Sequence, residues 1–211
     1  MRQRVLVADA PHRLVTAMDL PQGVSYLEVT IEQQEGHSVL RLVQSGFGEG
    51  PDWDDQFEGM LSGWLVALGI LKFFAERYFE RKRREVLVLA DAPFERDELL
   101  DLQRTESGLS RWLTRSGAPG GAVGEPVRLV LENGMTLTGT VLRNTSSETL
   151  WSWDEIEGVM EIKAFRGPHW GSKVGIRISS WMEDAAELVD LDGWLPTVVG
   201  KLTSVLTQAA S

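Results

Sequence analysis

Three glycines alternate along Ser45–Asp55, a stretch that reads SGFGEGPDWDD and precedes a pattern typical of a helix. A glycine loop at a helix start binds phosphate when bare backbone N–H groups converge on the anion. Glu49, Asp52, Asp54 and Asp55 lie in the same stretch and would repel a phosphate, and no lysine follows the last glycine. We therefore expect a strand-to-helix junction in which Asp52 or Asp54 caps the helix and the other carboxylates complement its dipole.

The histidines and serines offer no recognisable catalytic or metal-binding pattern. His12, His37 and His169 lie far apart, and no pair has the spacing of metal ligands on a helix. No Gly-x-Ser-x-Gly motif marks a hydrolase nucleophile. We expect surface histidines and assign no metal site, no catalytic residue and no cofactor.

Carboxylates gather at two predicted helix starts, where they could perform acid–base chemistry if they were buried. They are Asp54, Asp55, Glu58, Asp184, Glu187 and Asp190. Capping and solvation explain carboxylates at a helix start without any catalysis. The sequence therefore favours a protein without enzymatic activity.

Aromatic residues form the strongest candidate for a binding site, since the chain contains eight tryptophans. Trp151 and Trp153 lie two apart on one predicted strand and so share a face. Trp112, Phe165 and Trp194 come from other elements that should close on the same sheet. We predict that these five residues line a pocket for an apolar ligand, with plain core packing as the alternative.

Composition limits the partners of this chain of 211 residues. Its net charge of −10 argues against nucleic acid as the main partner, and the absence of cysteine suits a reducing cytoplasm. The basic run Arg81–Arg84 lies between Glu80 and Glu85, where we expect it to end a helix. The first residues lack the apolar core of a signal peptide, and the longest apolar run, around Trp64–Leu71, is short of a membrane span. We predict a cytoplasmic protein that binds neither nucleic acid nor membrane.

Two parts of the chain repeat each other. Leu14–Val24 matches Thr149–Val159, and Ser62–Leu65 matches Asp192–Leu195. Each matched block runs through strands and a polar loop to an acidic helix start. The repeat predicts two related structural units.

Alternation of apolar with other residues predicts the strands. The alternating segments are 26–31, 39–43, 86–89, 127–131, 135–142, 150–153, 159–165 and 174–178. Short turns such as Glu132–Gly134 favour antiparallel sheets. The second unit is predicted to run from strand 86–89 through short helices and five further strands to a long helix, whereas the first begins in the middle of that order.

Apolar residues three and four apart predict two long helices. One stripe comprises Phe57, Met60, Leu61, Trp64, Leu68, Leu71, Phe74 and Tyr78, and the other comprises Leu188, Leu191, Trp194, Leu195, Val198, Leu202, Val205 and Leu206. Pro196 interrupts the second stripe and predicts an end or a kink there.

This order of elements resembles the helix-grip fold of the START and Bet v 1-like (SRPBCC) superfamily, in which a curved antiparallel sheet wraps a long C-terminal helix. The stretch Ser45–Gly59, followed by Gly63–Trp64 and Leu71–Lys72, is similar to the activator of heat-shock-protein-90 ATPase homologue family. The resemblance implies an α+β fold with a truncated helix-grip unit over residues 1–84 and a complete one over 85–211.

The resemblance also implies a cavity between sheet and helix that takes a hydrophobic small molecule. An alternative is a co-chaperone-like activator, or an interaction module, for a heat-shock ATPase. A further alternative is an enzyme of the cyclase or hydratase type, which would need a polar pair with a perturbed pKa in the cavity. Because the first unit lacks the opening strand and helices, its sheet should need a cover, and a homodimer is one predicted cover.

Overall fold

The computed structural model describes residues 3–20, 23–167, 171–183 and 186–209. The chain divides into two compact units, residues 1–54 and 55–211. Each unit is described below by itself.

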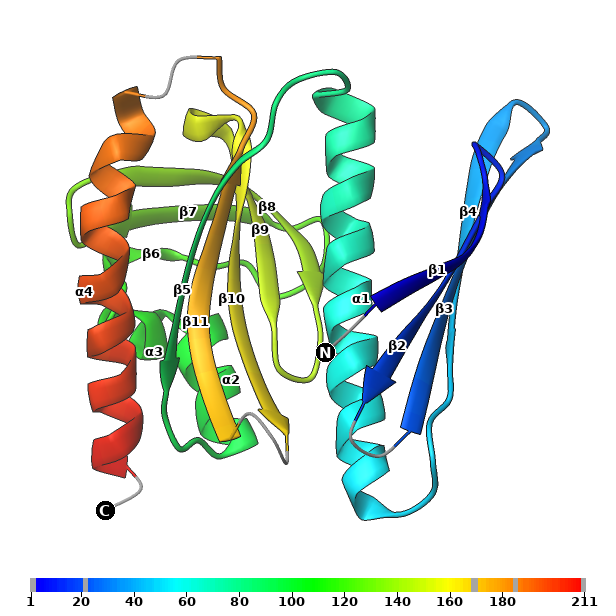
Figure 1. The fold of residues 1–211 in the computed structure, drawn as a ribbon. Coiled ribbons are helices and arrows are strands. Elements are labelled where there is room, and N and C mark those ends of the chain that lie inside the picture. Colours follow the sequence, from blue (N-terminus) through cyan, green and yellow to red (C-terminus); the bar gives the residue numbers. More distant parts are fainter. Residues whose placement is uncertain (1–2, 21–22, 168–170, 184–185, 210–211) are drawn as a thin grey trace. The chain divides into compact units, whose positions relative to one another are not determined.

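The first unit is a four-stranded antiparallel sheet in the order β1-β2-β3-β4 (Figure 1). Its strands are β1 (Gln3–Asp9), β2 (Arg13–Leu20), β3 (Gly23–Gln34) and β4 (His37–Ser45). Consecutive strands pair in this sheet, so neighbours in sequence are neighbours in the sheet.

The two faces of this first sheet differ in polarity. Because side chains alternate along a strand, the register places one set of apolar residues together on one face. That set comprises Leu14, Met18, Leu27, Val29, Ile31, Leu40 and Leu42. The opposite face is mixed and carries the ion pair between Arg13 Nε and Glu28 Oε1 at 2.8 Å.

The glycine stretch is a strand-to-helix junction, as predicted. Strand β4 ends at Ser45, and helix α1 (Pro51–Arg77) begins after Gly50. Gly46 has a φ of +92°, and a Cβ there would lie 2.2 Å from the carbonyl oxygen of Val24, so only glycine fits. The prediction that Asp52 or Asp54 is the N-cap is wrong, because both residues lie inside the first helical turn.

The second unit contains the remaining elements. They are β5 (Arg84–Asp91), α2 (Arg96–Arg104), α3 (Glu106–Ser110), β6 (Thr114–Ala118), β7 (Pro126–Leu131), β8 (Thr136–Asn144), β9 (Thr149–Trp153), the 3-10 turn Asp154–Ile156, β10 (Gly158–Gly167), β11 (Gly171–Ser180) and α4 (Ala186–Ala209). The strands form one antiparallel sheet in the order β5-β11-β10-β9-β8-β7-β6. The first strand of the unit thus pairs with its last, and the chain between them forms the rest of the sheet.

The core of the second unit lies between this sheet and helices α2, α3 and α4. Helix α4 contributes Leu191, Leu195, Val198, Val199, Leu202 and Leu206, all buried. A sheet wrapped on a C-terminal helix confirms the predicted α+β helix-grip fold, with the complete copy here and a truncated sheet in the first unit.

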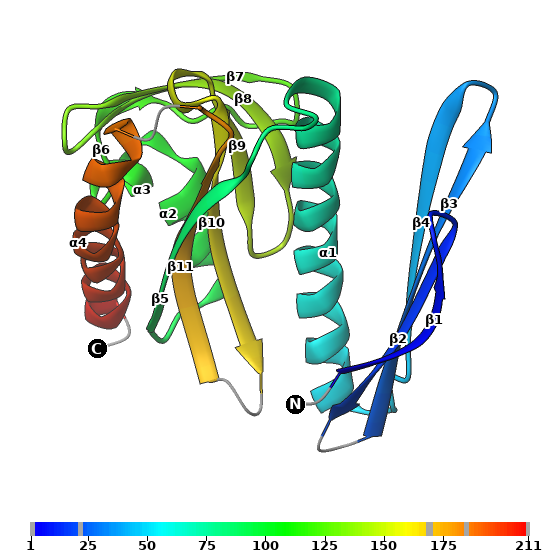
Figure 2. The same ribbon diagram turned by 45° about the horizontal axis from the view of Figure 1, so that its top comes forward.

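Helix α1 covers the other face of the second sheet, and Figures 1 and 2 both show α1 and α4 on opposite sides of it. Its residues Val66, Ile70 and Phe73 pack against Leu150, Val159 and Trp181. The ring of Tyr78 stacks on Trp181 with centroids 5.4 Å apart. The predicted stripe is therefore only partly the face that is buried here, because Phe74 and Tyr78 pack against this cluster whereas Leu61 and Leu71 remain nearly half exposed.

Two local predictions about the second unit are wrong. Strand β6 was not predicted, because its sequence TRSGA is polar and forms the edge of the sheet. Helix α4 continues through Pro196 to Ala209, so the predicted end there is wrong, and the alternative of a kink stays a prediction. Leu195 before the proline and Val198 after it are both buried in the core.

By length and composition, residues 57–77 of α1 could cross a membrane, which the short apolar run in the sequence did not predict. In the structure this segment lies on the sheet through Val66, Ile70 and Phe73. A mostly buried core helix of a soluble protein passes the same test, but only 22% of the most apolar window of this segment is buried.

Candidate functional site

The candidate site forms where strand β10 extends beyond its neighbour β9. The pairing between them runs from Gly158 with Trp153 to Ile162 with Thr149. Strand β10 continues to Gly167, so its last residues have no partner in β9. This mismatch leaves a gap in the sheet between α1, the start of α2 and the loop before β9.

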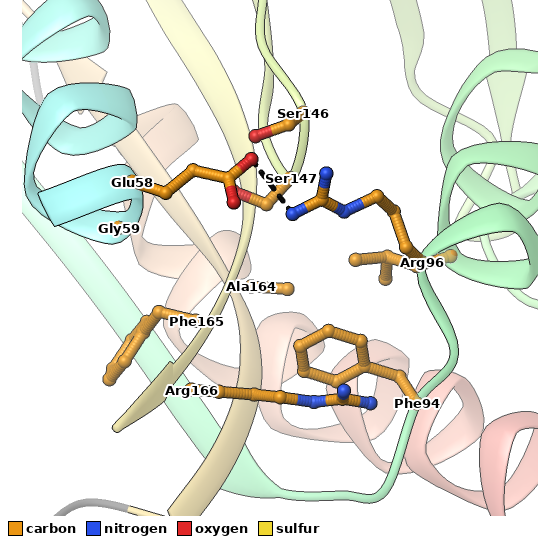
Figure 3. Close-up of a pocket in the computed structure, with 10 residues that line it drawn as sticks. Glu58, Gly59, Phe94, Arg96, Ser146, Ser147, Ala164, Phe165 and Arg166 are labelled. Atoms are coloured by element: carbon orange, nitrogen blue, oxygen red, sulfur yellow. Dashed lines mark ion pairs between the residues drawn. The ribbon is translucent and has the colours of Figure 1, made fainter. Parts of the chain in front are cut away.

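A pocket of about 120 Å³ occupies this gap. It is lined by Glu58, Gly59, Phe94, Arg96, Leu99, Ser146, Ser147, Ala164, Phe165 and Arg166 (Figure 3). Phe94, Leu99 and Ala164 also belong to the main core. The pocket thus has an apolar floor that continues into the core and a rim of charged and hydroxyl groups.

An ion pair lies on one side of the rim. Arg96, the first residue of α2, places its Nη2 atom 2.8 Å from Oε1 of Glu58 on α1. Figure 3 shows Ser146 and Ser147 beside this pair. Hydrogen bonds from Arg96 and Ser146 hold the pKa of Glu58 below its usual value, so Glu58 is ionised at neutral pH.

A second guanidinium lies on the opposite side of the rim. Arg166 lies over the ring of Phe94, with its Cζ atom 4.4 Å from the ring centroid (Figure 3). Its ion-pair partner is Glu95 at 3.6 Å, and the Glu95 side chain is 87% exposed. Because Glu95 is so exposed, Phe94 fixes the position of Arg166 more firmly than that ion pair does.

Buried charges lie next to the pocket, beneath α1. Glu148 Oε2 accepts a hydrogen bond from Ser62 Oγ of α1 at 3.1 Å. Lys163 Nζ lies 3.3 Å from Glu161 Oε1 and 3.8 Å from Glu148 Oε1, and Arg177 Nε lies 3.3 Å from Glu161 Oε2. Two carboxylates and two cations therefore share this buried region of the sheet.

Burial, followed by the neighbouring charge of Glu161, raises the pKa of Glu148 to about 7, although Lys163 and Ser62 oppose the shift. A carboxyl group that titrates near neutral pH could act in proton transfer. The Glu148 residue is only 3% exposed, however, so a substrate would reach it only if α1 moved.

The structure divides the predicted ligand-binding residues between two places. Trp112, Trp151 and Trp153 are fully buried in the main core, and Trp194 packs against that core partly buried. Phe165 instead lines the pocket in the gap of the sheet. Their predicted role in ligand binding stays a prediction.

The buried indoles differ in their hydrogen bonds. Trp112 Nε1 donates to the carbonyl of Leu102 at 2.9 Å, and Trp153 Nε1 donates to the carbonyl of Thr136 at 3.0 Å. Trp151 Nε1 is buried without an acceptor among the described residues. A buried N–H without an acceptor is costly, so this atom could bind an oxygen of a molecule inside the core.

The remaining chemical candidates stay outside this site. His12 and His37 are exposed in the first unit, and His169 lies outside the described residues. Asp184 is also outside them, as are the side chains of Glu187 and Asp190. Across the described ranges, no three His, Cys, Asp or Glu side chains are grouped to hold a metal ion.

Sequence reasoning missed most of the pocket. Glu58 was considered only as a helix-start carboxylate, and Arg96, Arg166, Ser146 and Ser147 were not considered. These residues come from separate segments that only the folded sheet brings together. The sequence pattern carries no signal for the different lengths of β9 and β10 that open the gap.

Comparisons with known proteins find similar solved structures. No family model and no curated protein matches the sequence. The Aha1 protein of Colwellia psychrerythraea, described as a dimer, is 13% identical over 59% of this chain and 96% of its own, with a TM-score of 0.49. A protein from Mesorhizobium loti is 17% identical over 59% of this chain and 98% of its own, also with a TM-score of 0.49.

The di-domain ARO/CYC protein BexL covers more of the chain. It is 12% identical over 97% of this chain and 79% of its own, with a TM-score of 0.47. None of these three TM-scores reaches 0.5, so the helix-grip assignment rests on the strand order of the second unit and not on these structures.

Proposed function

We propose that this chain is a non-enzymatic helix-grip protein that binds a small, mainly apolar molecule in the pocket beside the end of β10 that extends beyond β9. The observation that carries the proposal is the pocket floor, where Phe94, Leu99 and Ala164 belong also to the main core. A concave site with an apolar floor and a few polar groups at its rim is the usual form of a small-molecule site.

The size of the pocket sets the size of the ligand. An engineered apolar cavity of about 150 Å³ binds benzene, and this pocket has about 120 Å³. A single ring or a short branched chain is therefore the group that the pocket accepts. A larger molecule would leave part of itself outside the rim.

Two glycines of α1 provide a matched test. Gly59 lines the pocket, Gly63 lies one turn further along and does not line it, and a Cβ at either position meets nothing within 4 Å. Leucine raises helix propensity at both positions, so both variants should fold. Gly59→Leu should fill the pocket, whereas Gly63→Leu should not.

The probe for this test is benzyl alcohol, followed by NMR shifts of Ala164 and Phe165. We expect saturable shifts in the natural protein and in Gly63→Leu, and their loss in Gly59→Leu. Shifts that are absent from the natural protein, or unchanged in Gly59→Leu, would refute binding at this pocket. Native mass spectrometry of the purified protein would identify a natural ligand that is retained.

One atom supports the prediction that the tryptophans bind a ligand. Trp151 Nε1 has no acceptor among the described residues, and a ligand that reached past the pocket floor could supply one. Binding at Trp112, Trp151, Trp153 and Trp194 therefore remains a second part of this proposal. It would appear as shifts of the indole N–H signals when the natural ligand binds.

A second candidate function is an interaction module, and the first sheet favours it. Its apolar face includes Leu14 and Ile31, which are 41% and 38% exposed. Apolar sheet faces of this kind mark protein–protein contacts. A heat-shock ATPase is the partner that the family resemblance implies, and an unchanged ATPase rate on addition of the purified chain would argue against it.

A further inference from the structure

Two arginines line the pocket of this strongly acidic protein, whose net charge is −10. Arg96 pairs with Glu58 at 2.8 Å, and Arg166 pairs with Glu95 at 3.6 Å. Both carboxylates are partly or largely exposed, so an anion can reach either guanidinium by displacing an exposed carboxylate.

Each arginine has a partner at the pocket. The ring of Phe94 supports Arg166 at 4.4 Å, and the ion pair with Glu58 orients Arg96. Guanidinium groups match carboxylates in shape and can donate two parallel hydrogen bonds. In Figure 3 the guanidinium of Arg96 lies beside Glu58, and that of Arg166 lies against the ring of Phe94 on the other side of the rim.

Glu58 is the internal competitor for an anionic ligand. Its ion pair with Arg96 is partly exposed, at 43% for Glu58 and 56% for Arg96. Exposed ion pairs contribute little to stability. A ligand carboxylate can therefore replace Glu58 beside Arg96 at small cost while Arg166 binds it from the other side.

From this arrangement we infer that the pocket selects small amphipathic ligands with an anionic group, such as an aromatic carboxylate, whose ring rests on the floor and whose charge lies between Arg96 and Arg166. This inference rests on the proposed function, because it names the class of ligand for the same pocket. It gives Glu58 the role of a counter-ion that the ligand displaces.

The experiment compares benzoate with benzamide, which have nearly the same shape and differ in charge. Both are titrated into the full-length protein and followed by NMR shifts of Ala164 and Phe165. We expect benzoate to bind about tenfold more tightly than benzamide. Added salt should weaken the binding of benzoate and leave the binding of benzamide nearly unchanged.

Four substitutions test the roles of the individual charges. Arg166→Gln and Arg96→Gln should each remove most of the preference for benzoate. Glu58→Gln should increase the affinity for benzoate several-fold and leave the affinity for benzamide unchanged. Arg128→Gln should change the affinity for neither ligand. Arg128 is exposed on β7, which two strands separate from β10.

The outcomes separate this inference from the proposed function. Equal binding of benzoate and benzamide, or an unchanged preference in both pocket arginine variants, would overturn the inference while ligand binding itself stands. A pocket that responds to benzyl alcohol and not to millimolar benzoate would overturn it in the same way. Loss of the response to all three compounds would refute the proposed function together with the inference.

Discussion

Two tryptophans on β9 provide a matched pair for separating packing from hydrogen bonding. Trp151 and Trp153 are both fully buried in the same core, but among the described residues only Trp153 Nε1 of the two has an acceptor, the carbonyl of Thr136. Substitution by phenylalanine removes a similar volume from each. We expect Trp153→Phe to lower the free energy of unfolding by about 1 kcal/mol more than Trp151→Phe, because it leaves a buried carbonyl unsatisfied.

Urea denaturation of the two variants measures this difference. Equal losses would mean that the hydrogen bond of Trp153 contributes nothing net. A larger loss for Trp151→Phe would mean that its N–H has a partner such as a bound molecule. The sequence predicted that the two residues share a face, because the two-residue period of a strand is local, but it could not indicate which indole finds an acceptor.

Glu148 makes stability depend on pH. Burial raises its pKa in the folded state to about 7, from 4.5 for the ordinary group. A raised carboxyl pKa means that the folded state binds the proton more tightly than the unfolded state. The stabilisation is therefore complete below pH 4.5 and is lost as the pH rises through about 7.

The variant Glu148→Gln should remove this dependence. It keeps an acceptor for Ser62 and cannot ionise, so at pH 8 it should be more stable than the natural protein by up to about 3 kcal/mol. At pH 4.5 the two should be nearly equal. Urea denaturation across this range measures the difference, with Glu106→Gln, at an exposed residue of α3, as the control. A constant gap between the natural protein and Glu148→Gln would contradict the assignment.

At the scale of elements, strands with an inner apolar face were predictable and edge elements were not. The alternation in Val174–Ile178 places Val174, Ile176 and Ile178 in the core, so the pattern follows directly from burial. Most residues of strand β6 are exposed, so its sequence does not alternate in this way. The pocket likewise arises from the unequal lengths of β9 and β10, which no local pattern specifies.

The packing of helix α1 bears on where the second unit begins. The predicted boundary at residue 84 excludes α1, yet Val66, Ile70 and Phe73 cover Leu150, Val159 and Trp181 of the second sheet. A chain of residues 85–211 would expose those three residues and the buried charges around Glu148. We expect it to be less stable than residues 55–211 by on the order of 5 kcal/mol, from the apolar surface left uncovered.

Urea denaturation and dye binding to exposed apolar surface compare the two fragments. Equal stability with no added dye binding would show that residues 85–211 form a complete domain. A large difference would place α1 within the second domain. The sequence repeat predicts α1 as the last element of the first unit. In the structure, Val66, Ile70 and Phe73 of this helix pack on the second sheet.

At the scale of the whole molecule, the first unit limits how the chain can exist in solution. Within its described residues, only Thr16, Ala17 and Ser25 are buried, and none of the buried core clusters includes this sheet. An amphipathic sheet without a core needs a cover for its apolar face. A second copy of the chain is the cover that we predict, and the contact would be symmetric between identical sheet faces.

Two exposed residues on opposite faces of this sheet test the dimer. Ile31 lies on the apolar face and is 38% exposed, and Val39 lies on the mixed face and is 40% exposed. Lysine at Ile31 should raise the dimer dissociation constant by at least about tenfold, because it places a charge in an apolar contact. Lysine at Val39 changes a face that already carries charges and should leave the dimer intact. Sedimentation of the natural protein and both variants over a range of concentrations measures this. A natural protein that stays monomeric throughout, or equal weakening by both lysines, would contradict a dimer formed through this face.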